Sequence, residues 1–119
     1  MILKTMSGGR MHLYIGGKHV YTADNFVVPG EWHHYAVTFA SGKAKFYRDG
    51  VLKITRPVSA TTALPEVKAF RIGGSEAPFT GSIDELRVWG TTLTDEQLRM
   101  YANAPIADVA KAEAELYIL

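Results

Sequence analysis

Residues 30–56 alternate short runs of apolar and aromatic residues with pairs of turn-forming residues. The run from Trp32 to Phe39 is rich in aromatic and β-branched side chains, which favour a β-strand. Successive side chains of a strand point to opposite faces, and in this run both faces include apolar groups. The pattern therefore predicts a strand that is covered on both faces and central to its sheet.

Two turns connect this run to the strands that follow it. Ala40-Ser41-Gly42-Lys43 forms the first turn, after which residues 44–48 return alongside. Asp49-Gly50 forms the second, because this pair suits a type I′ turn, in which both central residues have positive φ. Residues 51–56 are then a third strand. The three strands together form an antiparallel meander, the unit of an all-β domain.

Further elements are predicted on both sides of this meander. Strands are expected at residues 2–6, 10–15, 19–22, 70–72 and 79–89, with Ser7-Gly8-Gly9 and Gly16-Gly17 as breaks between the first three. Pro57 and Pro65 exclude a central strand from the segment between them.

The C-terminal part of the chain has a helical pattern. Residues 94–97, Thr-Asp-Glu-Gln, form a capping box, so a helix is expected to begin there and to end near Ala102. Residues 106–115 consist mainly of good helix formers. The last four residues, 116–119, are apolar and compatible with a strand.

Three stretches together resemble a known family. The motif Trp-His-His-Tyr-Ala-Val-Thr-Phe at residues 32–39, the Ser-Gly turn and Phe-Tyr-Arg-Asp-Gly at 46–50 resemble the middle of a laminin G-like domain of the concanavalin A-like lectin and glucanase superfamily. The resemblance continues through residues 70–74, 79–89 and 93–98, and covers about residues 11–102. It implies an all-β, antiparallel jelly-roll β-sandwich, incomplete at the N-terminus, with a short C-terminal helical segment. Residues 1–104 would be the partial sandwich, and 105–119 a helical linker and a terminal strand.

The resemblance also predicts how the chain assembles. The family's sandwich has additional strands before the part that residues 1–22 match, so we expect a truncated module of a larger protein. The alternative is a naturally minimal domain whose sheet another chain completes. A sheet without its outer strands exposes unpaired backbone groups that pair readily with a second chain. We therefore expect a homo-oligomer in which residues 1–6 and 116–119 complete a neighbour's sheet.

Composition narrows the functional classes. The 119 residues are 47% hydrophobic and 21% charged, as in ordinary globular domains, and the net charge is only +1. A nucleic-acid-binding domain would have a strongly basic face, so we expect no nucleic-acid partner. There is no cysteine, which excludes disulfides and thiolate metal sites. No apolar run has transmembrane length, and residues 1–6 do not form a targeting signal, so we expect no membrane insertion.

Catalytic motifs are not found. No serine lies in a Gly-x-Ser-x-Gly motif, and the four histidines lack the His-Glu-x-x-His spacing. Glycoside hydrolysis requires two carboxylates that face one sugar bond, whereas Asp84 and Glu85, as strand neighbours, would point to opposite faces. The related glucanases have a Glu-x-Asp-x-x-Glu strand that this sequence lacks. The sequence therefore predicts a protein that is not an enzyme.

Asp84 is the candidate metal ligand. In the predicted strand 79–89 it shares a face with Leu86 and Val88, and a carboxylate on an apolar face requires a partner. The resemblance implies one possible partner, a structural calcium ion, because jelly-roll relatives often hold one near this edge. The alternative is a buried aspartate that accepts backbone N–H groups of a neighbouring loop.

Aromatic side chains are the candidate ligand-binding groups, because the apolar faces of sugars stack on rings. The candidates are Tyr14, Tyr21, Tyr35, Tyr47 and Trp89, with Arg48 and Arg87 as donors to hydroxyl groups or to an acidic sugar. Most tyrosines of a β-domain serve packing, so we expect only one or two of the five rings to line a site.

Two functional classes fit these features. The first is a non-catalytic carbohydrate-binding or adhesion module of a larger extracellular or cell-surface bacterial protein, with a glycan or a protein as ligand. The second is a structural module that contacts other proteins. A remnant of a glycan-degrading enzyme is the third hypothesis, for which the sequence contains no catalytic pattern.

Overall fold

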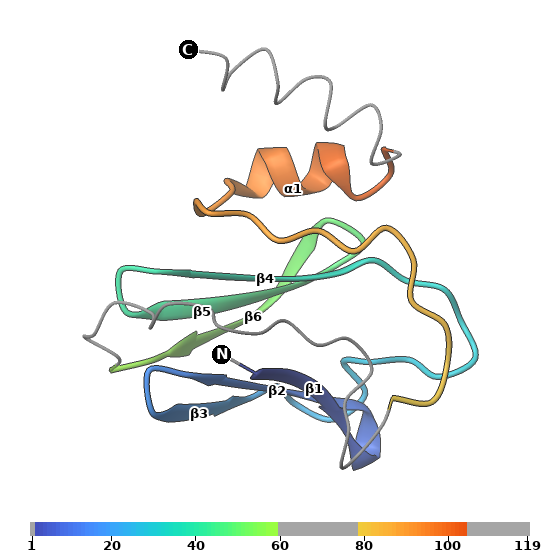
Figure 1. The fold of residues 1–119 in the computed structure, drawn as a ribbon, viewed down its shortest axis with the longest axis horizontal. Coiled ribbons are helices and arrows are strands. Elements are labelled where there is room, and N and C mark those ends of the chain that lie inside the picture. The colour runs from blue at the N-terminus through green and yellow to red at the C-terminus, as the bar shows by residue number, and fades with distance from the viewer. Residues whose placement is uncertain (1, 60–78, 105–119) are drawn as a thin grey trace.

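The computed structural model describes residues 2–59 and 79–104, and two three-stranded antiparallel sheets form most of this part (Figure 1). In the first sheet the strand order is β1-β2-β3, with β1 at Ile2–Met6, β2 at Arg10–Ile15 and β3 at Lys18–Tyr21. In the second it is β4-β5-β6, with β4 at Tyr35–Ala40, β5 at Lys43–Arg48 and β6 at Val51–Pro57. One helix, α1, spans Asp95–Tyr101, and a single 3₁₀ turn at Ser7–Gly9 joins β1 to β2. The predicted β-rich fold with a short C-terminal helix is confirmed.

Three two-residue turns set the registers of these sheets. Gly16-Gly17, Ser41-Gly42 and Asp49-Gly50 connect β2 to β3, β4 to β5, and β5 to β6. All six residues have positive φ, between 51° and 78°. This is the backbone geometry of the type I′ hairpin, whose twist matches that of the strands. The predicted turns are therefore confirmed.

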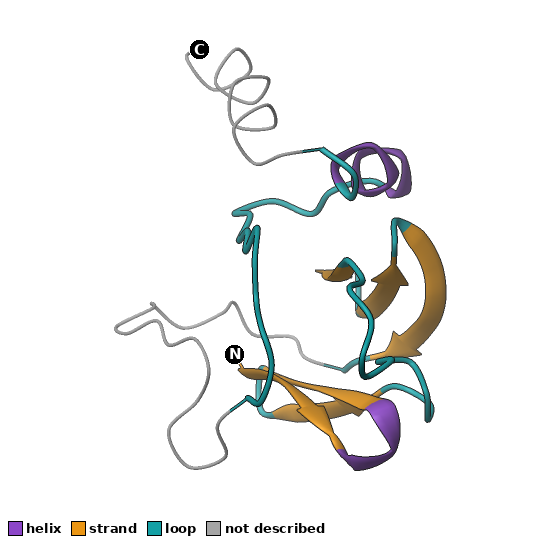
Figure 2. Ribbon diagram, turned by 90° about the vertical axis from the view of Figure 1, so that its right-hand side faces the viewer, coloured by secondary structure: helices purple, strands orange, loops and turns teal. Residues whose placement is uncertain are grey.

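The main hydrophobic core lies between the two sheets (Figure 2). Each sheet contributes alternate residues of its strands, since side chains of period two reach one face only. The buried members are Met11, Leu13, Ile15, Val20, Phe26, Ala44, Phe46 and Val58. Tyr35, Val37 and Phe39 of β4 pack against them, as the predicted face pattern requires.

A second, smaller core covers the other face of the β4-β5-β6 sheet. Tyr47 packs there with Leu93, which lies in the loop before α1, and with Leu98 and Tyr101 of α1. Ala36 of β4 also contacts this cluster. Strands β4 and β5 are thus covered on both faces, as predicted for β4. In the described part of the sheet, however, β5 and not β4 has the central position.

The strand predicted at residues 32–39 begins three residues later, at Tyr35. Trp32 lies outside it with 71% of its surface exposed. The reason lies in Asp49: its Oδ1 accepts the backbone N–H of His34 at 3.0 Å, and its own N–H donates to the His34 carbonyl at 2.7 Å. Asp49 therefore hydrogen-bonds with both the backbone N–H and the backbone carbonyl of His34.

The strand predicted at residues 79–89 is not present. A strand is stable only when a neighbour pairs with its backbone, and none of the described strands pairs with this segment. Glu85 also has a φ of 54°, which interrupts an extended conformation. Consequently Ile83, Leu86 and Val88 are exposed rather than buried.

The predicted capping box of α1 is confirmed. Thr94 Oγ1 accepts the Gln97 N–H at 3.1 Å, and Gln97 Oε1 accepts the Thr94 N–H at 2.9 Å. These bonds satisfy two donors that a helix N-terminus otherwise leaves unpaired. No helix in the described part has the length and apolarity that crossing a membrane requires. The strand predicted at 70–72 and the elements predicted within 105–119 lie outside the described residues.

His33 bridges two carboxylates at the start of β4. Its Nε2 is 2.7 Å from Glu31 Oε2, and its Nδ1 is 2.7 Å from Asp49 Oδ2. The hydrogen bond with Glu31, followed by that with Asp49, raises the pKa of His33 above its ordinary value of 6.5. Both ring nitrogens donate in this arrangement, so the charged imidazolium is the form that the folded state prefers.

This bridge predicts a pH-dependent contribution to stability. Because the folded pKa of His33 is raised, its contribution is complete below pH 6.5 and is lost as the pH rises through the folded pKa. We expect His33→Gln to be destabilising at about pH 6 and nearly neutral well above the raised pKa. Urea unfolding of both proteins across this range measures the difference. A difference that does not change with pH would show that the charge of His33 adds no stability.

Candidate functional site

The outer face of the β1-β2-β3 sheet has a row of aromatic rings. The registers place His12 opposite Tyr21 and Tyr14 opposite His19 across the β2-β3 hairpin. The alternate residues Leu13 and Val20 point into the core, so these four rings lie on the side away from it. Strand β1 adds Lys4 opposite His12 on the same face.

His12 and His19 form a direct ring-to-ring hydrogen bond. Nε2 of His12 is 2.9 Å from Nδ1 of His19, and the ring planes differ by 12°. The ring centres are 5.1 Å apart, which is much longer than the nitrogen–nitrogen distance, so the rings meet edge to edge rather than face to face. One ring donates and the other accepts, which fixes both rings in nearly one plane.

Tyr21 lies against this pair. Its ring centre is 4.5 Å from that of His12, with planes only 11° apart, an offset stack. His12 is buried, with 5% of its surface exposed. Burial, then the nearby Lys4 and then His19 lower the pKa of His12, so that ring is neutral at physiological pH. Tyr21 itself stays 41% exposed.

Charged donors flank the rings. The Arg10 guanidinium carbon lies 5.8 Å from the centre of the Tyr21 ring, a cation–π contact, and Arg10 Nε is 3.7 Å from Asp24 Oδ1. The face thus combines flat rings with N–H and ammonium donors. This combination can bind a sugar, whose C–H face stacks on a ring while its hydroxyls accept hydrogen bonds. We call the surface formed by Lys4, Arg10, His12, Tyr14, His19 and Tyr21 the ring face.

Of the predicted ligand-binding residues, only Tyr14 and Tyr21 belong to the ring face. Tyr35 and Arg48 instead hold the loop before β4. The Tyr35 hydroxyl accepts the Val28 N–H at 2.9 Å, and Arg48 Nη1 donates to the Phe26 carbonyl at 2.9 Å. Their positions therefore favour a role in packing.

Tyr47 and Trp89 contact the region of α1. Tyr47 is 1% exposed, and its hydroxyl donates to Asp95 Oδ1 at 2.5 Å. Burial, then the hydrogen bond to Asp95, raises the pKa of Tyr47 to about 12, so the hydroxyl keeps its proton. Trp89 stacks on Tyr101 at 5.7 Å.

Arg87 secures the end of the same helix. It donates to the Tyr101 carbonyl at 2.9 Å and to the Ala104 carbonyl. Its Nη2 is also 3.3 Å from Glu85 Oε2. Carbonyls at a helix C-terminus lack partners within the helix, so this arginine completes α1 rather than facing a ligand.

Asp84 is not on a core face, so the expectation of a buried carboxylate is wrong. The residue is exposed, and its Oδ1 accepts the N–H of the adjacent Glu85 at 2.8 Å. Both readings of Asp84 assumed the strand 79–89, which is not formed. Within the described residues no three histidine or carboxylate groups converge as a metal site would require. Calcium binding stays a prediction.

The sequence interpretation overlooked His12 and His19. A signal was nevertheless present: the Gly16-Gly17 hairpin turn, read with the two-residue period of strands, places residues 12, 14, 19 and 21 on one face.

The fold and the ring face define a β-sandwich module with a candidate binding surface on one outer sheet. Residues 3–99 match the laminin G family model described as the concanavalin A-like lectin/glucanases superfamily. The chain belongs to this family, and the resemblance predicted from the motifs is confirmed.

Relatives and a solved structure were also found. Two relatives, from Rattus norvegicus and Mus musculus, are each a "Sushi, von Willebrand factor type A, EGF and pentraxin domain-containing protein 1". Each is 30% identical over 105 aligned residues, or 77% of this chain, and the chain spans only 3% of either protein. A solved structure of an S-layer domain-containing protein from Clostridium thermocellum (residues 221–444) has a TM-score of 0.49 and 18% identity, covering 85% of this chain and 55% of that one.

Proposed function

We propose that this chain is a non-catalytic carbohydrate-binding or adhesion module, and that the ring face binds the glycan. The observation that supports this most is the stack of Tyr21 on His12 beside the His12–His19 hydrogen bond. These contacts hold the rings in place before a ligand arrives, which reduces the entropy lost on binding. The mammalian relatives are named for several kinds of domain, which supports a module within a larger protein.

The parent protein is proposed to be extracellular or on the cell surface, as the family resemblance implies. A bacterial source, a bound calcium ion and a homo-oligomer formed through the terminal residues stay predictions.

A second candidate function is a structural module that contacts other proteins. The segment 79–89 supports this alternative, because Phe79, Ile83, Leu86 and Val88 are all at least 41% exposed. Exposed large apolar side chains can contribute to protein contact surfaces. A glycan array distinguishes the two candidates, since only the first predicts a specific glycan.

The binding proposal predicts a loss of affinity in Tyr21→Ala. A stacked aromatic contact is worth roughly 0.5–1.5 kcal/mol beyond the area it buries, and about 1.4 kcal/mol corresponds to a factor of ten. We expect the dissociation constant of the best array glycan to rise on the order of tenfold. Isothermal titration calorimetry measures it.

Trp32→Ala is the matched control, because Trp32 is a 71% exposed aromatic residue that does not belong to the ring face. This variant should bind like the wild type. Equal losses in both variants, or no loss in Tyr21→Ala, would contradict a site on the ring face.

A further inference from the structure

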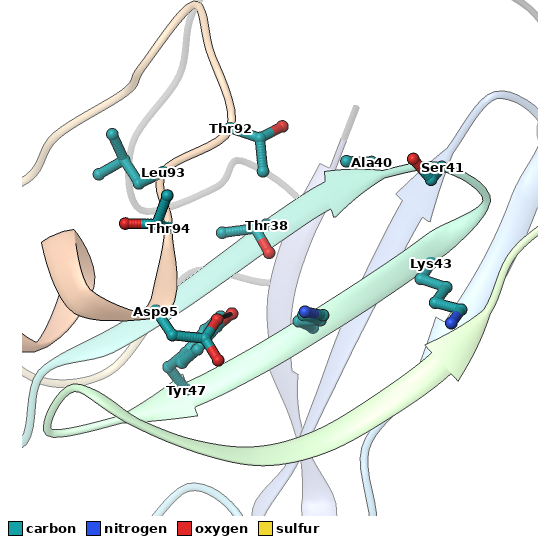
Figure 3. A pocket seen from close by; sticks show the side chains of 10 residues that line it. Thr38, Ala40, Ser41, Lys43, Tyr47, Thr92, Leu93, Thr94 and Asp95 are labelled. Atoms are coloured by element: carbon teal, nitrogen blue, oxygen red, sulfur yellow. Dashed lines mark hydrogen bonds between the residues drawn. The ribbon is translucent and has the colours of Figure 1, made fainter.

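A pocket lined by both polar and apolar groups lies on the opposite side of the sandwich from the ring face, on the α1 side of the second sheet (Figure 3). Its volume is about 590 Å³, within the range of small-ligand sites. Strands β4 and β5 form the floor, and the loop before α1 forms the wall. The lining residues are Thr38, Ala40, Ser41, Lys43, Lys45, Tyr47, Thr92, Leu93, Thr94 and Asp95.

The wall of the pocket is fixed to its floor. Thr92 Oγ1 donates to the Phe39 carbonyl of β4 at 3.0 Å. Leu93 is 6% exposed and packs in the second core. The Tyr47–Asp95 hydrogen bond joins β5 to the first residue of α1. These three attachments hold the pocket open in a defined shape without a ligand.

The one carboxylate in the lining is already bonded. Asp95 accepts the Tyr47 hydroxyl at 2.5 Å, and the Thr38 hydroxyl in turn bonds to Tyr47. The Tyr47 proton is therefore directed at Asp95 and is not available to a ligand. Thr94 Oγ1 accepts the Gln97 N–H, which leaves its own O–H able to donate.

The remaining polar groups are donors. Lys43 and Lys45 project from the same face of β5, two residues apart, and neither makes an ion pair with any described residue. Lys45 is half-buried, whereas Lys43 is exposed. Asp95 keeps its negative charge, but its Oδ1 is occupied by the Tyr47 hydroxyl, and the two lysines outnumber this one carboxylate in the lining.

We infer that this pocket binds a small ligand with an anionic oxygen group, a carboxylate, sulfate or phosphate, which Lys45 contacts. An ammonium is a three-fold donor without acceptor capacity, so an anionic oxygen is the partner that satisfies it best. Lys43 at the rim adds a second positive charge, and the Thr94 hydroxyl adds a donor from the wall. This site is independent of the ring face and does not rest on the glycan proposal.

The size of the pocket sets the size of the ligand. A single inorganic anion would fill only a small part of about 590 Å³. The volume accommodates an organic acid or a single sugar ring with a charged substituent. Glucuronate and glucose are therefore suitable probes, since they share a ring and differ in the charged group.

The experiment is a titration of the isotope-labelled chain with glucuronate and, separately, with glucose, followed by amide NMR shifts. Glucuronate is expected to shift the amides of residues 43–47 and 92–95, and glucose to leave them in place. Inorganic phosphate, tested in the same way, should bind more weakly at the same amides. Shifts that are equal for glucose and glucuronate, or that occur away from the pocket, would overturn the inference.

Three lysine variants complete the test. Lys45→Gln should raise the dissociation constant of glucuronate about tenfold, since hydrogen bonds to charged groups are the stronger ones. Lys53→Gln removes the same charge from an exposed position on β6 outside the pocket and should leave affinity unchanged. Lys45→Arg keeps the charge and should retain most of the binding.

The thermal melting of each variant shows whether it is folded. A folded Lys45→Gln that binds like the wild type would overturn the assignment, and so would equal losses in Lys45→Gln and Lys53→Gln. Tyr21→Ala, which alters the ring face, should bind glucuronate normally in this pocket. The binding of an array glycan that is lost in Tyr21→Ala but not in Lys45→Gln therefore tests the proposed function separately from this pocket.

Discussion

Phe46→Ala is expected to lower the free energy of unfolding by about 3–5 kcal/mol, the range found for large-to-small changes of buried aromatic residues. Phe46 is 0% exposed and lies in the middle strand of its sheet, in the core shared by both sheets. Its ring meets Phe26 edge to face at a centre distance of 6.0 Å. Truncation removes this contact and leaves a cavity between two sheets that cannot close fully.

Chemical denaturation monitored by circular dichroism measures the change. Phe79→Ala is the matched control, because this phenylalanine is 41% exposed and its replacement should cost much less. Similar losses in both variants would mean that Phe46 is not in a core between the sheets.

Gly50→Ala is expected to be the second most damaging change. Gly50 has a φ of 78°, a conformation that costs an L-residue roughly 1–2 kcal/mol. A Cβ at this position would also lie 2.8 Å from the Arg99 Cα and 3.3 Å from the Ala102 Cβ of the helical segment. Since backbone cannot yield easily, we expect roughly a further 1–3 kcal/mol from displacement of α1.

Gly17→Ala separates these two effects. Gly17 has the same φ of 78°, but nothing lies within 4 Å of the position its Cβ would take. This variant should therefore show the backbone strain alone, and Gly50→Ala should be measurably less stable in the same denaturation experiment. Equal losses would show that α1 does not rest on the β5-β6 turn.

Structural features that depend on residues close together in the chain could be predicted from the sequence. The three hairpins follow from turn pairs whose φ preferences are local, and the capping box of α1 follows from Thr94 and Gln97. The alternation of Tyr35, Val37 and Phe39 with Ala36 likewise predicted which side chains of β4 meet each core.

The sequence-based predictions were wrong where residues far apart in the chain determine the local structure. The start of β4 was misplaced because Asp49, fifteen residues from His34 along the chain, takes its backbone groups. The segment 79–89 has a strand pattern, but no described strand pairs with it, so Asp84 is exposed and not buried. A pattern of side chains cannot show whether a backbone partner is present.

The candidate sites were only partly predictable. Tyr14 and Tyr21 were expected among the ligand-binding rings, whereas the role of His12 and His19 required the cross-strand register. Tyr47 was also expected among the ligand-binding rings; it lines the pocket, but its hydroxyl donates to Asp95, a residue 48 positions away.

The sequence by itself determined the hairpins, the helix start and the family, since each depends on residues close together in the chain or on motifs read directly. Only the tertiary structure decided that the loop before α1 lies over β4 and β5 to form a pocket, and that Arg87 completes α1 rather than facing a ligand. These features require segments far apart in the chain to meet. Such contacts form because burying apolar surface outweighs the entropy of ordering the chain, a balance that no single stretch of sequence contains.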